Sequence, residues 1–367
     1  MGTEEKRFPL PREALCEHMI PHSKPFIDND DVRAATEVIA SGNLAQGERV
    51  GAFEQAFADS VGTGSAVAVS SGTAALHLSL LALGIGKGDE VIIPSFVCSA
   101  LLNAVNYVGA TPILADIGHS TYNIDPEDVE HRITGRTRAI ILPHTFGEVA
   151  DLERFLEMGI PIIENCAQAV GARYRGQCVG SFGTISMFSF YATKVMTTGE
   201  GGMVVSEAED LLATVRELRD YDERTPYRVR YNYKMTDIQA ALGLSQLKKL
   251  PDFISRRTAI AMQYTEAFSD LPVGLPNIRP DGSSIFYRYV IMLKERADQF
   301  IEEMAASGVV CCRPVFRPIH DLLGTQVLPR TERAWQRAVS IPIYPALKDQ
   351  EIDHIIEAVR HACTVCQ

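Results

Sequence analysis

Short apolar segments alternate with helix-like segments between residues 65 and 164, and this alternation constrains the fold more than any other feature. Strands are expected at 65–69, 90–94, 111–116, 138–143 and 160–164, with helices at 74–83, 100–108, 126–133 and 151–158. Apolar strands separated by helices are typical of a mostly parallel sheet that helices cover on both faces. Ligands of such sheets bind beyond the carboxyl ends of the strands. The sequence therefore predicts an α/β fold with its site at that edge.

The segments on either side of this alternation have a different order of expected helices and strands. Before it, helices are expected at 30–41, with Asn29 as a candidate N-cap, and at 53–60. After about residue 251, the expected elements are helix 253–268, strand 286–293, helix 297–307, strand 309–314 and helix 349–361. These elements predict a smaller α+β domain. We therefore expect an N-terminal arm at 1–25, a large α/β domain at 26–250 and a small C-terminal domain at 251–367.

The composition narrows the class of protein and of partner. The 367 residues are 46% hydrophobic and 22% charged, which is typical of a globular protein and is enough chain for two domains. A net charge of -11 argues against a general nucleic-acid binder, although a local group of donors can still bind a small anion. We find no signal peptide and no apolar run long enough to span a membrane, so we expect no membrane partner.

The cysteines indicate the redox setting. The eight cysteines are irregularly spaced and form neither a disulfide framework nor a four-ligand metal pattern. Cys363 and Cys366 make one CxxC motif close to His361, but no second ligand pair accompanies it. We interpret this motif as a solvated tail and expect no metal site. A reducing, cytoplasmic location follows.

Lys194 is the strongest candidate for a residue with a chemical role. It follows an apolar, strand-like run at 185–191 and precedes a glycine-rich stretch at 199–202 and a further apolar strand. Burying a lysine ammonium between two strands is costly. The cost is lower where the amine forms a Schiff base with a carbonyl cofactor, because that chemistry needs one fixed, partly desolvated lysine. A surface lysine in a loop is the alternative interpretation.

The motif SSGTAAL at 70–76 joins the first expected strand to a helix. Free backbone N–H groups, the positive end of the helix dipole and hydroxyl side chains converge there, which suits a phosphate group. Ser189, five residues before Lys194, could add another hydroxyl. The alternative is a plain strand-to-helix turn with a serine or threonine cap.

Two further segments carry polar residues at informative places. The run IENCAQ at 163–168 closes a buried strand, so its side chains project at the carboxyl edge or simply form a solvated strand end. Thr236 and Gln239 have the spacing of a capping box at the start of an amphipathic helix. Asn232, just before that helix, is free to reach a ligand or is a loop residue without one.

Taken in order along the chain, these motifs resemble those of the DegT/DnrJ/EryC1/StrS family of pyridoxal-phosphate-dependent sugar aminotransferases. The resemblance runs from Ser41 to Pro342 and is carried by SSGTAALHL, GDEVIIPSF, VGATPILADI, ENCAQAVGA, FSFYATK, TGEGG and YNYKMTDIQAALG. It implies the aspartate-aminotransferase-like fold, known as fold type I, in which a large domain with a mostly parallel sheet is followed by a small α+β domain. It also implies pyridoxal 5′-phosphate as the cofactor.

The resemblance implies roles for residues around the cofactor. Lys194 is expected to hold the cofactor as a Schiff base and then to move a proton at the substrate carbon. Gly72, Thr73 and Ser189 are expected to bind the phosphate, and Gln168 is expected to lie beside the hydroxyl group of the cofactor.

Further roles implied by the resemblance concern the partner subunit and the substrates. Asn232 is expected to contact the phosphate from the neighbouring subunit, which implies a homodimer with shared active sites. His320 is expected near the substrate. Arg230 and Arg313, together with Arg228, are candidate ligands for a diphosphate or a carboxylate, or are ordinary surface arginines.

The chain departs from the family pattern at three positions. Asn165 stands where the family has an aspartate that pairs with the protonated ring nitrogen of the cofactor. A charge-assisted hydrogen bond contributes roughly 1.5–3 kcal/mol. Glu164 is not expected to replace it, because adjacent residues of a strand point to opposite faces. Cys98 replaces an aromatic residue that stacks on the ring, and Lys234 replaces an arginine.

These observations leave three functions open. The first is transfer of an amino group from L-glutamate or L-glutamine to a keto-sugar, expected to be nucleotide-linked. The second is another reaction on the same scaffold, such as that of a lyase, an oxidase or a cyclising enzyme, which Asn165 and Cys98 suggest. The third is a binding or regulatory protein that keeps the cofactor without turnover. The retained Lys194 disfavours the dehydratase branch of the family, which has histidine there.

Overall fold

The chain folds around one large mixed sheet. The structure, a computed structural model, describes residues 19–119, 121–277 and 282–366. The sheet contains, in spatial order, β1 (Ala66–Val69), β9 (Gly202–Val205), β8 (Ile185–Ser189), β5 (Ile162–Asn165), β4 (Thr137–Pro143), β2 (Glu90–Pro94) and β3 (Thr111–Ala115). The strands from β8 to β3 are parallel, and β9 is antiparallel to both of its neighbours. The expected mostly parallel sheet is therefore confirmed.

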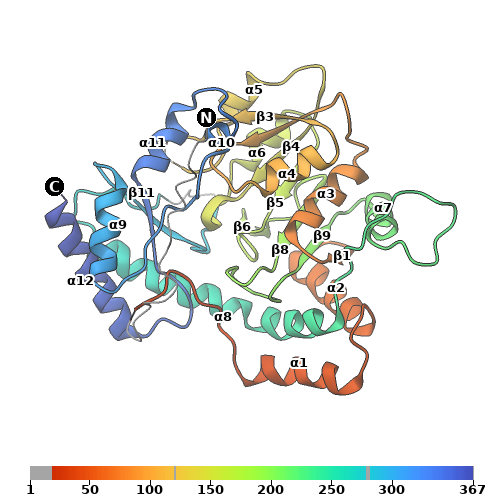
Figure 1. The fold of residues 1–367 in the computed structure, drawn as a ribbon, viewed down its shortest axis with the longest axis horizontal. Helices are drawn as coiled ribbons and strands as arrows, with labels where there is room; N and C mark the ends of the chain where they lie inside the picture. Colours follow the sequence, from red (N-terminus) through yellow and green to blue (C-terminus); the bar gives the residue numbers. More distant parts are fainter. Residues whose placement is uncertain (1–18, 120, 278–281, 367) are drawn as a thin grey trace, which may run out of the picture.

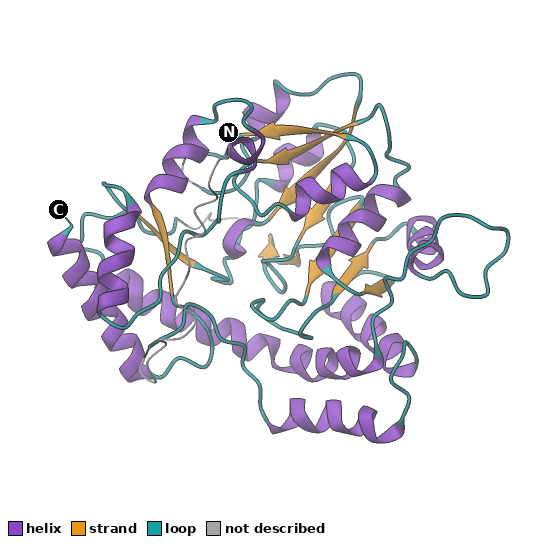
Figure 2. Cartoon of the chain, viewed as in Figure 1, coloured by secondary structure: helices purple, strands orange, loops and turns teal. Residues whose placement is uncertain are grey.

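Helices cover both faces of this sheet, as the apolar strands required (Figure 2). Successive residues of β1 point to opposite faces, so Ala66 and Ala68 enter one core while Val67 and Val69 enter the other. The helices α3 (Gly72–Ala82), α4 (Ala100–Tyr107) and α7 (Glu209–Arg219) supply the second core. The first core receives side chains from α2 (Glu48–Val61), α5 (Pro126–Glu130), α6 (Leu152–Glu157) and α8 (Asp237–Ala267).

The long helix α8 joins the sheet to the C-terminal part of the chain (Figure 1). Thr236 caps it, with Gln239 completing the expected capping box. The helix continues through Pro251, so the helix expected at 253–268 is its second half, and the boundary expected at 250 falls inside it. Helix α1 (Asn29–Ser41) lies alongside α8. Its N-cap is Asp28 rather than Asn29, because the Asp28 carboxylate accepts the free N–H groups of the first turn.

A two-stranded antiparallel sheet, β10 (Tyr289–Met292) and β11 (Ala338–Ile341), forms the centre of the C-terminal part. Helices α9 (Ala297–Ala306) and α12 (Asp349–Val365) pack against it and share one apolar core with the second half of α8. The short helices α10 (Ile319–Leu323) and α11 (Pro329–Arg337) lie between α9 and β11 in the sequence. A 3₁₀ turn, η1 (Thr145–Gly147), follows β4, and a small hairpin pairs β6 (Arg173–Tyr174) with β7 (Gln177–Cys178).

Two expectations about the C-terminal part of the chain need correction. The strand expected at 309–314 is wrong, because Val309 and Cys312 each form only a single bridge, to Ile20 and Ser340. The CxxC segment is not a solvated tail, because α12 extends to Val365 and buries Cys363 in the C-terminal core. The described end of the expected arm packs on the C-terminal part, where Ile20 is buried. None of the described helices is long and apolar enough to cross a lipid bilayer.

Candidate active site

Lys194 lies in the loop between β8 and β9, on the wall of a cavity at the carboxyl edge of the parallel strands. The cavity is also lined by Asn165 at the end of β5, Cys98 after β2, and Gln168. All four residues were expected from the sequence, and the structure brings them together. The rule that places ligands at the carboxyl edge of parallel strands therefore holds in this chain.

A cradle of backbone N–H groups and serine hydroxyls lies where α3 begins. Ser71 is the N-cap, and its hydroxyl accepts a hydrogen bond from the N–H of Ala74 at 3.1 Å. A Cβ atom on Gly72 would lie 2.8 Å from Cβ and 3.0 Å from Oγ of Ser189, so only glycine leaves room at this point. Gly202 is as tightly placed, since a Cβ there would lie 2.4 Å from the carbonyl oxygen of Ser71. Helix N–H groups and two serines thus come together in this cradle, and such donors suit the phosphate of the expected cofactor.

We expect Gly72→Ala to weaken cofactor binding. The added methyl group meets Ser189 at less than van der Waals distance, so it displaces the hydroxyl or closes the cradle. The affinity for pyridoxal 5′-phosphate, measured by fluorescence titration of the apoprotein, should fall by about 10-fold or more, as expected for one lost hydrogen bond to a charged group. Gly51→Ala is the matched control, because Gly51 lies in α2 with open space around it. Equal affinities in the two variants would contradict the assignment.

Asn165 is buried, and its orientation is fixed by a local hydrogen bond. Its side-chain oxygen accepts from the N–H of Ala167 at 3.1 Å. The amide oxygen keeps a second lone pair, and the NH₂ group is a donor. The amide is neutral, so it cannot compensate the charge of a protonated ring nitrogen as an aspartate carboxylate would.

Gln168 holds a strained turn beside the cavity. Its side-chain oxygen accepts from the N–H of Phe146 at 2.7 Å. Phe146 has a left-handed backbone, with φ 59°, which is uncommon for a residue other than glycine. Such strain persists only where the surroundings impose it, and it is frequent at ligand sites. Gln168 therefore stabilises the turn at Phe146 in the cavity wall, and this role is separate from a contact with a ligand.

Glu164 points away from Lys194, as the alternation of strand side chains predicted. Its carboxylate is fully buried and accepts hydrogen bonds from His144, Gly180, Phe182, Gly183 and Ser186. Burial opposes ionisation, but the hydrogen bonds and the nearby imidazole outweigh it and lower the pKa of the Glu164 carboxyl. Glu164 therefore anchors the loop after β7 and cannot replace the carboxylate that is missing at Asn165.

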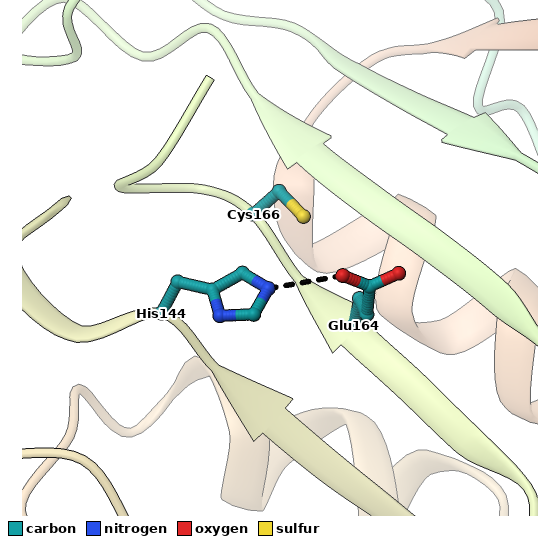
Figure 3. Close-up of side chains that lie close together, drawn as sticks. All are labelled: His144, Glu164 and Cys166. Carbon is teal, nitrogen blue, oxygen red and sulfur yellow. Dashed lines mark hydrogen bonds and ion pairs between the residues drawn. The ribbon is translucent and has the colours of Figure 1, made fainter. Parts of the chain in front are cut away.

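His144, Glu164 and Cys166 form a buried cluster whose ligand-type atoms lie within 4.8 Å of one another (Figure 3). Nδ1 of His144 accepts from the N–H of Ala150 at 3.1 Å, so Nε2 carries the proton and donates to Glu164 at 3.0 Å. Burial raises the pKa of the Cys166 thiol well above its usual range, which disfavours the thiolate. Both ring nitrogens of His144 and both carboxylate oxygens of Glu164 are already hydrogen-bonded, and we interpret the cluster as structural.

Tyr287 is a cavity residue that the sequence analysis missed. Nζ of Lys194 lies 5.1 Å from the centre of the Tyr287 ring, within the range of a cation–π contact. Burial alone would raise the pKa of this phenol, but Lys194 and Arg288 outweigh it and lower the pKa. Nη1 of the buried Arg257 fixes the segment by donating to the carbonyls of Phe286 and Tyr287. A tyrosine in an apolar run gives no local signal for such a role.

The structure places His320 beside the cavity and not on its wall. Nδ1 of His320 lies 2.7 Å from the hydroxyl oxygen of Ser95, and Nε2 lies 3.5 Å from the carboxylate of Glu332. The imidazole is buried and is not among the groups that line the Lys194 cavity. The expected contact between His320 and a substrate stays a prediction.

The arginines expected as substrate ligands are engaged elsewhere. Arg230 donates to Glu217 through Nε at 2.8 Å, and Arg313 donates to Asp298 through Nη2 at 2.8 Å. Neither lines the Lys194 cavity, because each guanidinium group is held by a carboxylate away from it. Two arginines that the sequence analysis did not assign, Arg288 and Arg317, line the cavity in their place.

Comparison of the sequence with known proteins gives relatives that match most of the chain. It is 39% identical over 327 residues to a GDP-perosamine synthase of Caulobacter vibrioides, which covers 84% of this chain and 88% of the relative. It is 37% identical to the spore coat polysaccharide biosynthesis protein SpsC of Bacillus subtilis, which covers 94% of this chain and 97% of the relative.

Comparison of the structure agrees. A solved Streptococcus pneumoniae protein, assigned as a sugar aminotransferase and captured in its PLP form, matches with a TM-score of 0.90 at 27% identity, over 95% of this chain and 100% of that one. This likeness confirms the expected fold type and the expected cofactor. The model of the DegT/DnrJ/EryC1/StrS aminotransferase family matches residues 25–360. The chain therefore belongs to the DegT/DnrJ/EryC1/StrS family and is a pyridoxal-phosphate-dependent aminotransferase.

Proposed function

We propose that this enzyme moves an amino group from L-glutamate or L-glutamine to a keto-sugar that is linked to a nucleotide. The observation that carries the proposal is the position of Lys194 on a cavity at the carboxyl edge of the sheet. A GDP-perosamine synthase among the relatives supports the nucleotide-linked sugar. The relatives are named for sugar aminotransfer and polysaccharide synthesis, so they do not favour the lyase, oxidase or cyclising alternatives.

Different residues of the chain would bind the cofactor and move the proton. Pyridoxal 5′-phosphate, when bound, supplies an aldehyde and an electron-withdrawing ring. Lys194 would bind the aldehyde covalently, and after its release its amine would move the proton at the substrate carbon. The face of the Tyr287 ring makes a cation–π contact with the Lys194 amine. Gly72, Thr73 and Ser189 would hold the phosphate, and Cys98, Asn165 and Gln168 would surround the ring.

We further propose a cytoplasmic homodimer in which Asn232 completes the phosphate site of the partner subunit. Asn232 is exposed, and it does not line the Lys194 cavity of its own chain. An exposed amide that the family uses at the phosphate supports a contact across an interface. The seven described cysteines are all free, which supports a reducing compartment. We also retain the division into an arm at 1–25, a large domain at 26–250 and a small domain at 251–367 as part of this proposal.

The test is the absorbance spectrum of the enzyme reconstituted with pyridoxal 5′-phosphate, recorded before and after adding L-glutamate. We expect the visible band of the lysine-bound cofactor to be replaced by the shorter-wavelength band of the aminated cofactor. Adding 2-oxoglutarate should restore the first band, because the half-reaction is reversible. A band that neither L-glutamate nor L-glutamine changes would contradict the proposed donor.

A further inference from the structure

Arg288 places a guanidinium group where two cavities meet. The first cavity is the one that Lys194 and Tyr287 line. The second lies between the large sheet and the C-terminal part, with Tyr122 and Arg330 in its lining. The two cavities share Phe146 and Arg288. A ligand in either cavity can therefore reach this cation.

Among the described residues, the side chains that contact the Arg288 guanidinium are neutral, and the acidic residue that shares a cavity with it is Glu148, in the lining of the second cavity. Nη1 lies 3.1 Å from Nε2 of His22 and 3.7 Å from Sγ of Cys312, and Cζ lies 5.5 Å from the centre of the Tyr287 ring. Burial, and then the charge of Arg288, lower the pKa of His22 to about 3, so this imidazole is uncharged at neutral pH. Burial likewise raises the pKa of the Cys312 thiol.

No carboxylate among the residues that the structure describes pairs with Arg288. Its Nε is buried and has no hydrogen-bond partner. Neighbouring arginines differ, because Arg317 is paired with Asp321 and Arg330 with Asp125. Arg288 is partly buried, and a charged group that loses part of its hydration is normally compensated by a partner. Arg288 therefore has the character of a cation whose partner is a ligand.

The backbone around Arg288 is held in place before any ligand arrives. The N–H of Arg288 donates to the carbonyl of Phe146 at 3.3 Å, and Gln168 in turn holds the N–H of Phe146. Phe286, two residues before Arg288, has a left-handed backbone with φ 48°, and Arg257 binds its carbonyl. A binding residue on a strained and well-supported segment is typical of a preorganised site.

We propose that Arg288 binds the α-carboxylate of the amino donor. The lining of the Lys194 cavity contains no aspartate or glutamate, and a guanidinium group binds a carboxylate through two parallel hydrogen bonds. Lys194 and Arg288 contact the same ring, that of Tyr287. In an amino acid the carboxylate is attached to the reacting carbon itself, whereas the diphosphate of a nucleotide-linked sugar is several bonds from the keto carbon. The inference rests on the proposed function and specifies how its first substrate is recognised.

The first test uses glutarate, which has the two carboxylates of L-glutamate and no amine to transfer. Titration calorimetry of the holoenzyme should show affinity reduced by about 10- to 100-fold in Arg288→Met, the loss expected for a hydrogen-bonded ion pair. Arg288→Lys should recover part of it. Arg33→Met is the matched control, because Arg33 is exposed on α1. Glutarate binding requires no turnover, so this measurement stands even if the proposed function fails.

The second test is the half-reaction with L-glutamate, followed by absorbance. In Arg288→Met, the concentration of L-glutamate at half-maximal rate should rise by about 10- to 100-fold. The resting spectrum of the bound cofactor should not change. Unchanged glutarate affinity would overturn the proposal. Weaker glutarate binding with an unchanged L-glutamate half-reaction would also overturn it, because the carboxylate that Arg288 binds would then belong to the acceptor.

Discussion

Lys194→Ala should abolish both the covalent attachment of the cofactor and amino transfer. Lys194 is the lysine on the cavity wall, and the loss of a positioned proton carrier alone slows a reaction by about 10²- to 10⁴-fold. Borohydride reduction followed by mass spectrometry should add the mass of the reduced cofactor to the peptide that contains Lys194 in the native enzyme. The variant should show no such addition and no visible band.

The control for this prediction is Lys87→Ala, because Lys87 is exposed in the turn before β2. It should retain the visible band and full activity. Lys194→Ala should also raise the pKa of Tyr287, since the variant lacks a cation that favours the phenolate. An ultraviolet pH titration reports that change independently of activity. A variant at Lys194 that still carries reducible cofactor would place the attachment on another lysine.

Local patterns were sufficient for the central sheet and for placing Lys194 and Asn165 at its carboxyl edge. Each strand from 65 to 164 is a short apolar run, and burial on both faces makes such runs conspicuous. The capping box at Thr236 was equally local, because it depends on two side chains three residues apart. Lys194 and Asn165 could be placed at the same edge because parallel strands end together.

The wrong expectations concern segments whose secondary structure or burial depends on tertiary contacts. Pro251 does not end α8, because Leu250 and Phe253 on either side are packed into the core, which compensates for one lost hydrogen bond. The apolar run at 309–314 has the composition of a strand, yet it meets its neighbours only at single bridges. The CxxC motif without a second ligand pair favours a solvated tail, but helical spacing places Cys363 on the face of α12 that buries Val359.

The cavity residues that the sequence analysis missed reach the cavity only through contacts with distant parts of the chain. Tyr287 and Arg288 lie just before β10 and far from Lys194 in the sequence. Their place on the cavity depends on hydrogen bonds from Arg257 and to the carbonyl of Phe146, which no local pattern encodes. The paired state of Arg230 and Arg313 is equally non-local, and so it could not be distinguished from a free arginine in the sequence.

Asn165→Asp should speed the half-reaction with L-glutamate. The native side chain is a neutral amide whose oxygen already accepts one hydrogen bond, from the N–H of Ala167. A carboxylate at the same place keeps that hydrogen bond and has a second oxygen that accepts from a protonated ring nitrogen. A charge-assisted hydrogen bond of roughly 1.5–3 kcal/mol, present where electrons accumulate on the ring, corresponds to about a 10- to 100-fold higher rate constant. Stopped-flow absorbance with saturating L-glutamate measures this rate constant.

Asn103→Asp is the matched control, because Asn103 is exposed on α4 and the substitution adds the same charge outside the cavity. It should leave the rate constant unchanged. A faster half-reaction in Asn165→Asp alone would mean that the native amide limits aminotransfer, and that Asn165 is a departure which the enzyme tolerates. A slower one would mean that the native site works with an unprotonated ring nitrogen, to which the amide donates. The sign of the change thus fixes the protonation state for which the Asn165 position is built, whichever sugar the enzyme aminates.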